Sequence, residues 1–465
     1  MLLWRGLLFG VVTCAALATS AAAKPVDEQA LRALLVERVD VRKWGTGIVV
    51  GITSPQGRRI VSYGTLSLQD RRKVDGATVF EIASLTKVFT ALVLADMAAR
   101  KQVTLDAPVG TCLPAGVSVP AHGGKQITFI DLATHSSGLP LRPSNLASQT
   151  ALNKYAGYTV EQLYQGLADF KLTRDPGSAF EYSNWGFGLL GNALAYCAGA
   201  GKSYAALLAE RVTGPLKMQD TTFVPGSALR SRMAAPYDIR LQPVPNETTG
   251  ALDAAGGLYS TVADLLSFLD VFLGRGPQPL VAAGTAMIEP RRPGDGPDTR
   301  MGLGWRVTTA RDITTIWSSG RADGYRAFMA FDPRQHVAVV ALTNAATNVG
   351  VDDIGWHVLD PSVAITRVHT RTAVPADVLQ RYVGRYKFDD GVVMTVVREE
   401  DHLVVQMTGQ GPSAIFASGP REFFPEDIEA QFVFAESGTA PAQSLVLNQD
   451  GQTYKAQRLA EEGKP

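Results

Sequence analysis

The sequence has no surplus of charge of either sign. Its 465 residues include 44 Lys and Arg against 44 Asp and Glu, so the formal net charge is zero. Proteins that bind nucleic acid usually carry a basic surplus, and those that bind cationic partners often carry an acidic one. We therefore expect no nucleic-acid partner.

Cysteine and histidine are scarce. The chain has 3 Cys and 6 His, and neither type occurs at the Cys-x-x-Cys or His-Glu-x-x-His spacing that is typical of metal sites. We expect no metal and no cofactor. Two cysteines in the body of the chain, Cys112 and Cys197, are too few for a disulfide framework. They could pair in an oxidising compartment, but Cys197 lies on an apolar helix, where we expect a packed free thiol.

A long hydrophobic run is also missing. The apolar run at residues 6–18 is shorter than the ~20 residues that span a bilayer. It follows Arg5 and ends at Ala21-Ala22-Ala23, a pattern typical of a cleaved signal peptide. We expect residues 1–23 to be removed on export to a periplasm, leaving no integral membrane segment. Cys14 makes a lipid-anchored form an alternative, and an extracellular destination is another.

No Gly-x-Ser-x-Gly motif occurs, so the sequence lacks the usual nucleophile motif of the α/β-hydrolases. Ser84 is then the serine whose neighbours suit a nucleophile. The segment Ser84-Leu85-Thr86-Lys87 stands at the start of an apolar helix. Residues three apart share one helix face, so the Ser84 hydroxyl and the Lys87 amine can meet, and the amine can take the proton of the hydroxyl. The alternative is that Ser84 only caps the helix.

A second motif, Tyr182-Ser183-Asn184, follows about a hundred residues later. A tyrosine and an asparagine two apart on a turn can point into one cleft, the first as an acid or base and the second as a hydrogen-bond anchor. Alternatively, Tyr182 is a half-buried aromatic residue and Asn184 a helix N-cap. The order of the two motifs and their distance in the chain favour the functional interpretation.

Together the motifs resemble the penicillin-recognising serine hydrolases, in the branch of class C β-lactamases, DD-peptidases and related esterases. Residues 127–140, 215–223 and 255–261 are similar to signature stretches of that branch. The resemblance implies an α/β fold, with a β-lactamase/transpeptidase-like sheet flanked by helices and a helical lobe. It also implies that Ser84 is the nucleophile, that Lys87 and Tyr182 transfer protons, with either as the base, and that Asn184 binds substrate.

The third motif of that family, Lys-Thr-Gly or His-x-Gly, is altered here. By position its equivalent is Ser318-Ser319-Gly320, followed by Arg321, so the usual cation is missing. The resemblance implies that these four residues bind substrate and that the backbone N–H groups of Ser84 and Arg321 hold the oxyanion. Arg321 either supplies the missing charge or is a solvated residue beside a turn. Loss of the cation disfavours substrates that carry a carboxylate, including β-lactams.

The resemblance implies an exported serine hydrolase that forms an acyl-enzyme on D-amino-acid peptides or β-lactams. Because an ester leaves more easily than an amide, a small-ester carboxylesterase is an alternative. A weakly active protein that binds peptidoglycan fragments is another. The expected partner is thus a small-molecule or peptide substrate, with peptidoglycan-derived compounds included. We expect His135 to have a structural role beside a turn at Gly138.

The pattern along the chain predicts two domains. A helix over 26–42, a hairpin over 47–63, a helix-rich middle, a loop over 275–302, three or four strands ending at 343 and a helix over 352–357 form a hydrolase domain at residues 24–360. Residues 361–373 are expected to be a linker. Alternating strands at 382–388, 392–397, 403–407, 431–434 and 444–447 predict a small all-β barrel or sandwich over 374–465, similar to the lipocalin-like tails of some family members.

Overall fold

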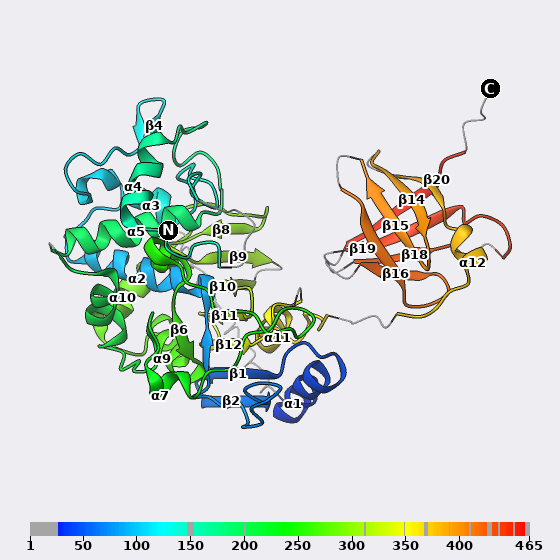
Figure 1. The fold of residues 1–465 in the computed structure, drawn as a ribbon, viewed down its shortest axis with the longest axis horizontal. Coiled ribbons are helices and arrows are strands. Elements are labelled where there is room, and N and C mark those ends of the chain that lie inside the picture. Colours follow the sequence, from blue (N-terminus) through cyan, green and yellow to red (C-terminus); the bar gives the residue numbers. More distant parts are fainter. Residues whose placement is uncertain are drawn as a thin grey trace, which may run out of the picture.

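Figure 1 shows the chain as a computed structural model. It describes residues 27–146, 153–199, 201–310, 313–347, 349–366, 371–389, 391–408, 411–425, 430–435, 438–449 and 452–460. The expected signal peptide at residues 1–23 lies outside the described residues.

An eight-stranded antiparallel sheet forms the frame of the larger part, with strand order β2-β1-β12-β11-β10-β9-β8-β7. The N-terminal hairpin thus completes a sheet whose other strands come from the end of this part, as expected for an opening hairpin. The strands are β1 (Gly47–Ser54), β2 (Gly57–Gly64), β7 (Arg292–Pro293), β8 (Thr299–Met301), β9 (Arg306–Ala310), β10 (Ile313–Arg321), β11 (Arg326–Asp332) and β12 (Val337–Thr343).

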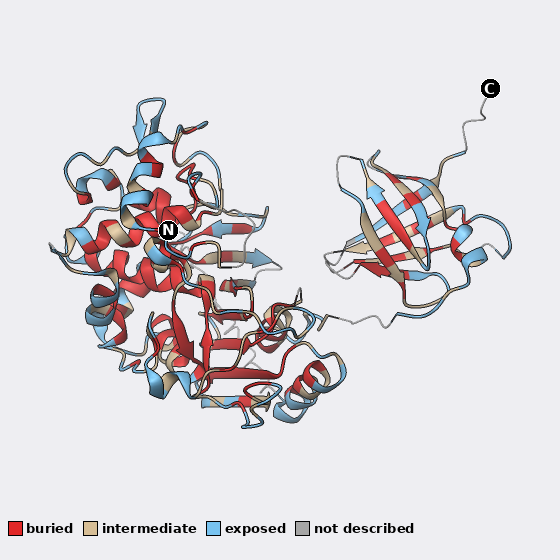
Figure 2. Cartoon of the chain, in the orientation of Figure 1, coloured by how far each residue is buried: buried red, intermediate tan, exposed pale blue. Residues whose placement is uncertain are grey.

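Helices cover both faces of this sheet (Figure 1). In β1, Ile48 and Val50 pack in one apolar cluster with residues of α1 (Glu28–Val36) and α11 (Asp352–Leu359). The intervening Val49 belongs to the main core, together with residues of α2 (Thr86–Ala99) and α9 (Val262–Phe272). Successive side chains of a strand point to opposite faces, so β1 is buried along its whole length. Figure 2 shows this burial continuing into α2.

Shorter elements build a helical lobe next to the sheet. Those that precede the Tyr182 segment are the strand β3 (Val79–Glu81), the 3-10 helices η2 (Ala83–Leu85) and η3 (Val109–Cys112), the hairpin of β4 (Ala121–His122) and β5 (Lys125–Gln126), and the helices α3 (Phe129–Ala133) and α4 (Val160–Asp169). Those that follow are α5 (Asn184–Cys197), α6 (Tyr204–Leu208), η4 (Ala209–Thr213), α7 (Ser227–Arg230), η5 (Gly250–Leu252), α8 (Asp253–Gly256), β6 (Tyr259–Thr261) and α10 (Gln278–Met287). The π-helical turn η1 (Glu37–Val41) extends α1, so the first helix matches the expected one.

The expectation of a proline- and glycine-rich loop over 275–302 was wrong, because α10, β7 and β8 lie within it. The proline and glycine content of this segment suggested irregular structure. Pro277, however, stands directly before α10, where the missing proline N–H would have no partner within the helix. Leu280 and Met287 of α10 are buried in the main core. Burial of this apolar face outweighs the weak helix propensity of Gly284.

The expectation of a free thiol at Cys197 was also wrong. Cys197, at the end of α5, forms a disulfide with Cys112 of η3, and their Cα atoms are 5.1 Å apart. The two residues are 85 positions apart in the sequence. No local pattern reports such proximity, which only the folding of the lobe creates.

The C-terminal part is a closed barrel of eight strands, β13 to β20. Its strands are β13 (Gly384–Phe388), β14 (Val393–Glu399), β15 (His402–Met407), β16 (Ser413–Ala417), β17 (Glu422–Pro425), β18 (Ala430–Phe434), β19 (Ser444–Gln449) and β20 (Gln452–Arg458), preceded by the short helix α12 (Ala376–Gln380). The sequence predicted five of these strands and missed β16, β17 and β20. The α/β fold with a small C-terminal all-β barrel is confirmed.

Apolar side chains fill the inside of the barrel, among them Tyr386, Leu403 and Phe434. An eight-stranded barrel is just wide enough for side chains to fill it. Among the described residues, this core shares no member with the two cores of the larger part. The separation supports our proposal that residues 24–360 and 374–465 are two domains joined by a linker at 361–373.

Candidate active site

Ser84 lies on a tight turn between a strand and the central helix. The chain leaves β3, makes the 3-10 turn η2 around Ser84, and enters α2 at Thr86. Ala83, just before Ser84, has a positive φ of 47°, which is costly for a residue with a Cβ. The turn leaves Ser84 partly exposed, whereas Lys87 one turn later is buried with 2% exposure. Ser84 lies inside η2, so it is not the cap of α2.

Three acceptors surround the amine of Lys87. Its Nζ donates hydrogen bonds to Ser84 Oγ at 3.0 Å, to Asn184 Oδ1 at 2.8 Å and to the Ala255 carbonyl oxygen at 2.7 Å. Burial, and secondarily the positive charge of Arg306, holds the pKa of Lys87 well below its usual value. A low pKa favours the neutral amine, which has two N–H groups for Asn184 and Ala255 and a lone pair that can accept from the Ser84 hydroxyl, the state a general base needs.

Tyr182 reaches the same hydroxyl from the lobe. Its OH donates a hydrogen bond to Ser84 Oγ at 2.7 Å. Burial raises the Tyr182 pKa, while the contacts with Ser84 and Arg306 work in the opposite direction. Lys87 Nζ is 4.7 Å from the centre of the Tyr182 ring. Ser84, Lys87 and Tyr182 thus form one connected cluster, together with Asn184. We call these four residues the Ser84 cluster.

His135 supports this cluster from behind Tyr182. The two rings are stacked with centroids 4.3 Å apart, and His135 Nδ1 accepts a hydrogen bond from the Ser183 N–H at 3.0 Å. An accepting Nδ1 places the proton of the neutral ring on Nε2. Burial first, then Lys87 and Arg306, keeps the pKa of His135 well below its usual value. His135 therefore fixes the Tyr182 ring as an uncharged packing partner, which agrees with the structural role expected for it.

Asn184 begins α5, but it does not cap it. The N-cap is Ser183, whose Oγ accepts a hydrogen bond from the Gly186 N–H at 2.8 Å. The Asn184 side chain is left to bridge Lys87, through Oδ1, and Tyr155, whose OH accepts from Nδ2 at 3.0 Å. The interpretation of Asn184 as a helix cap is thereby excluded.

The third motif lies at the end of β10, against the Ser84 turn. A Cβ on Gly320 would stand 2.3 Å from the Ile82 carbonyl oxygen and 3.3 Å from the Ser84 nitrogen, so only glycine permits this approach. Ser318 is buried, whereas Arg321 is exposed. The exposed Arg321 side chain agrees with the solvated alternative rather than with a cation inside the site.

The backbone of Arg321 is suitably placed for the oxyanion role that the sequence implied. The Ala322 N–H donates to the Tyr325 carbonyl, and Arg321 is paired with Arg326 one step further along the two strands. In antiparallel strands such pairs alternate, so the Arg321 N–H points away from β11. The strand β9 pairs with β10 up to Trp317, which leaves this edge of the third motif uncovered by β9.

Sequence reasoning missed a cation that the structure places beside the cluster. Arg306 of β9 is paired with Trp317, the residue just before Ser318. Its guanidinium is 4.8 Å from the Trp317 ring and 5.8 Å from the Tyr182 ring. Strand register decides this position, and no motif marks it in the sequence. Tyr155 and the Ala255 carbonyl were also missed as partners of the cluster.

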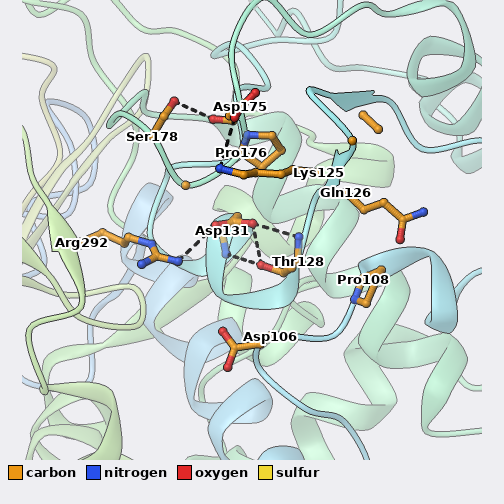
Figure 3. Close-up of a pocket in the computed structure, with 13 residues that line it drawn as sticks. Asp106, Pro108, Lys125, Gln126, Thr128, Asp131, Asp175, Pro176, Ser178 and Arg292 are labelled. Carbon is orange, nitrogen blue, oxygen red and sulfur yellow. Dashed lines mark hydrogen bonds and ion pairs between the residues drawn. The ribbon is translucent and has the colours of Figure 1, made fainter.

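A pocket of about 750 Å³ lies elsewhere on the lobe, next to β5 and α3 (Figure 3). Of the described residues that line it, none belongs to the Ser84 cluster or the third motif. Four of its charged groups form two pairs: Lys125 lies 3.2 Å from Asp175, and Arg292 lies 3.7 Å from Asp131. We assign no chemistry to this pocket.

No group of three or more His, Cys, Asp or Glu side chains in the described part of the chain is arranged to hold a metal ion. No helix among the described residues is long and apolar enough to cross a membrane.

Comparisons with known proteins agree with the geometry. The family model described as Beta-lactamase matches residues 31–361. The chain is 31% identical over 363 residues to the D-alanyl-D-alanine-carboxypeptidase/endopeptidase AmpH of Escherichia coli (strain K12), covering 73% of this chain and 92% of that protein. It is 24% identical to penicillin-binding protein 4* of Bacillus subtilis (strain 168), over 85% of this chain and 91% of that one.

Solved structures show the same fold. A beta-lactamase/D-alanine carboxypeptidase from Yersinia pestis, complexed with citrate, has a TM-score of 0.60 and 25% identity over 69% of this chain and 94% of that chain. An octameric penicillin-binding protein homologue from Pyrococcus abyssi has a TM-score of 0.65 and 20% identity, and it covers 92% of this chain and 99% of that chain. With a matching family model over most of its length, this chain belongs to the Beta-lactamase family of penicillin-recognising serine hydrolases.

Proposed function

We propose that the protein is an exported hydrolase that forms an acyl-enzyme on Ser84, with D-amino-acid peptides or β-lactams as substrates. The observation that carries the proposal is the convergence of Lys87 Nζ and the Tyr182 OH on Ser84 Oγ, at 3.0 and 2.7 Å. A D-amino-acid peptide as substrate is supported by the name of the Escherichia coli relative, a D-alanyl-D-alanine-carboxypeptidase/endopeptidase.

In the proposed acylation step, Ser84 Oγ attacks the substrate carbonyl carbon and Lys87 takes its proton. The pKa directions favour this division of roles, because burial lowers the pKa of Lys87, which favours the neutral amine, and raises the pKa of Tyr182, which favours the protonated phenol. The oxyanion that forms is stabilised by the N–H groups of Ser84 and Arg321. Tyr182 protonates the leaving group as the tetrahedral intermediate collapses, and the proton on Lys87 then restores the phenol.

In the proposed deacylation step, water attacks the acyl carbonyl carbon and gives up a proton to the same network. Ser84 then leaves as the alcohol, and the free acid is released. Asn184 holds the Lys87 amine through its Oδ1 and is itself held by Tyr155, so the network keeps its geometry in both steps.

A small-ester carboxylesterase is the second candidate, and Ser318 is the observation that favours it. The residue is buried at the position where the family carries Lys or His, so an anionic substrate group finds no cation there. An ester also needs less help from a proton donor than an amide does. The third candidate, a weakly active protein that binds peptidoglycan fragments, is disfavoured by the intact Ser84 cluster.

Export is supported by the disulfide between Cys112 and Cys197, because disulfides persist in oxidising compartments. The signal-peptide pattern in residues 1–23 supports it independently. A periplasm is the destination that we propose.

The test of substrate class is steady-state turnover of three compounds by the mature protein: a peptide ending in D-alanyl-D-alanine, a penicillin and an activated short-chain ester. The Ser84→Ala variant gives the background for each compound. We expect the wild type to turn over the peptide or the penicillin above that background. Turnover of the ester alone would favour the carboxylesterase, and binding of peptidoglycan fragments without turnover of any compound would favour the binding protein.

A further inference from the structure

The third motif of this chain has Ser318 where the family carries a Lys or His, so the motif itself provides no positive charge. Ser318 is 4% exposed and cannot supply positive charge. Arg321, next to the motif, has its side chain exposed, and its charge acts on Asp352 and Arg326. The structure brings a different cation to the place where the motif meets the cluster.

That cation is Arg306, and its position is fixed from three sides. Strand register sets it opposite Trp317, whose ring lies 4.8 Å from the guanidinium. Asp295, in the turn between β7 and β8, accepts a hydrogen bond from Arg306 Nε at 2.8 Å and forms an ion pair with Nη2 at 2.8 Å. The Arg306 side chain is only 13% exposed, and its guanidinium lies 5.8 Å from the Tyr182 ring.

We propose that Arg306 is a positioning residue that supplies, from the neighbouring strand, the positive charge that the third motif of this chain lacks. Arg306 acts through Lys87 and Tyr182: its charge favours the neutral Lys87 amine, which can accept the proton of Ser84. The inference rests on the proposed acyl transfer at Ser84. It differs from a carboxylate anchor, because the effect falls on proton transfer whatever the charge of the substrate.

The electrostatics around the cluster agree with this role. Arg306 lowers the pKa of Lys87, of Tyr182 and of His135, in each case as a smaller effect than burial. Asp295 acts in the opposite direction and raises the Tyr182 pKa. A cation held beside the Lys87 amine disfavours its extra proton, so the neutral amine that the acylation step needs is reached at a lower pH.

Among the residues that the structure describes, three charged or titratable groups from different elements face Lys87 and Tyr182. They are Arg306 on β9, Asp295 in the β7–β8 turn and His135 after α3, while Asp352 of α11 interacts with Arg306. Burial raises the pKa of Asp352 to about 6, so this carboxyl also titrates below neutral pH. Its effect on the profile is separated from that of Arg306 by an Asp352→Asn variant.

The test is the pH profile of kcat/KM for an activated ester that has no carboxylate, measured on the mature wild type and on Arg306→Gln. The acid limb of this profile is the fall of kcat/KM at low pH, where Lys87 gains a proton. In Arg306→Gln we expect this limb to move to higher pH by about one unit. At pH values below the limb, that shift is about a tenfold loss of kcat/KM. Arg306→Lys keeps the charge and should hold the limb near the wild-type position. Arg300→Gln is the matched control, since Arg300 is exposed on the adjacent strand β8, and it should leave the limb unchanged.

Three results would overturn the inference: an unmoved limb in Arg306→Gln, an equal shift in Arg300→Gln, or a loss confined to KM for a carboxylate-bearing penicillin. The last result would make Arg306 a substrate anchor. If Arg306→Gln does not fold, Asp295→Asn takes its place. It removes a negative charge, so the limb should move to lower pH, and an unmoved limb contradicts the inference. Failure of the wild type to acylate on Ser84 would instead overturn the proposed function.

Discussion

At the scale of single residues, burial decides the chemistry of this site. Lys87 is 2% exposed, and a buried ammonium is costly unless it is paired. Its three acceptors are two neutral side chains and a carbonyl, none of which carries a full negative charge. The protein therefore solvates the amine without holding its proton strongly, which suits a group that must accept and release a proton in each cycle.

Glu81 shows the same effect with a carboxyl group. It is 2% exposed and lies three residues before Ser84, at the end of β3. The Glu247 N–H donates to Glu81 Oε2 at 3.3 Å, but the Glu247 charge is repulsive. Burial, with a smaller contribution from Glu247, raises the Glu81 pKa from 4.5 to about 8.

We predict that Glu81 makes stability fall as pH rises. Between about 4.5 and 8 the unfolded chain has released the Glu81 proton while the folded chain keeps it, so alkaline pH favours unfolding. Glu81→Gln imitates the protonated acid and should remove this loss, which for the wild type is on the order of 4 kcal/mol in the free energy of unfolding between pH 5 and pH 9. Urea unfolding of both proteins at the two pH values measures it. Parallel pH dependence in wild type and variant would contradict the assignment.

At the scale of elements, the site depends on how closely β10 approaches η2. Gly320 is the point of contact, and the missing Cβ lets the third motif lie against the Ser84 turn. The turn itself is fixed by β3, which pairs with β6. The nucleophile is thereby held between a strand pair, a helix start and a sheet edge, and a reacting group on rigid elements keeps its geometry.

Gly320→Ala should therefore damage the site more than the fold. Its Cβ would clash with the Ile82 carbonyl oxygen at 2.3 Å, so the strand or the turn must shift. A displacement near 1 Å can cost on the order of 100-fold in rate, which is the loss in acylation that we expect. Gly226→Ala is the control, because nothing lies within 4 Å of a Cβ there. Unchanged acylation kinetics in a folded Gly320→Ala protein would show that this approach is not required.

At the scale of the whole molecule, distant segments meet in ways that only the fold creates. The disulfide joins Cys112 of η3 to the last residue of α5, whose first residue is Asn184. The helix that carries part of the Ser84 cluster is thus tethered at its far end. We expect the double variant Cys112→Ser and Cys197→Ser to lose about 2–5 kcal/mol of stability.

Denaturant unfolding of the wild type, with and without a reductant, and of the double variant tests this expectation. Reduction should lower the wild type to the level of the variant and should leave the variant where it is. Alkylation of unfolded, unreduced mature protein should label neither cysteine. Two labelled thiols in that protein would show that the bond does not form.

Sequence could predict what is local or what a motif marks. Ser84 and Lys87 meet because they are three apart where η2 runs directly into α2. Tyr182 was placed with them by the family resemblance, although it lies 98 positions from Ser84. Arg306 was not found, because its place depends on the register of β9 against β10. The disulfide needed the packing of the lobe, and the three missed barrel strands have too weak an alternation to stand out.

The mass of the mature protein, residues 24–465, after reaction with a penicillin or an activated ester shows whether Ser84 is the nucleophile. We predict that the wild type gains the mass of one acyl group and that peptide mapping places it on Ser84. The Ser84→Ala variant should gain nothing under the same conditions. A Ser84→Ala protein that is labelled as readily as the wild type would contradict the account.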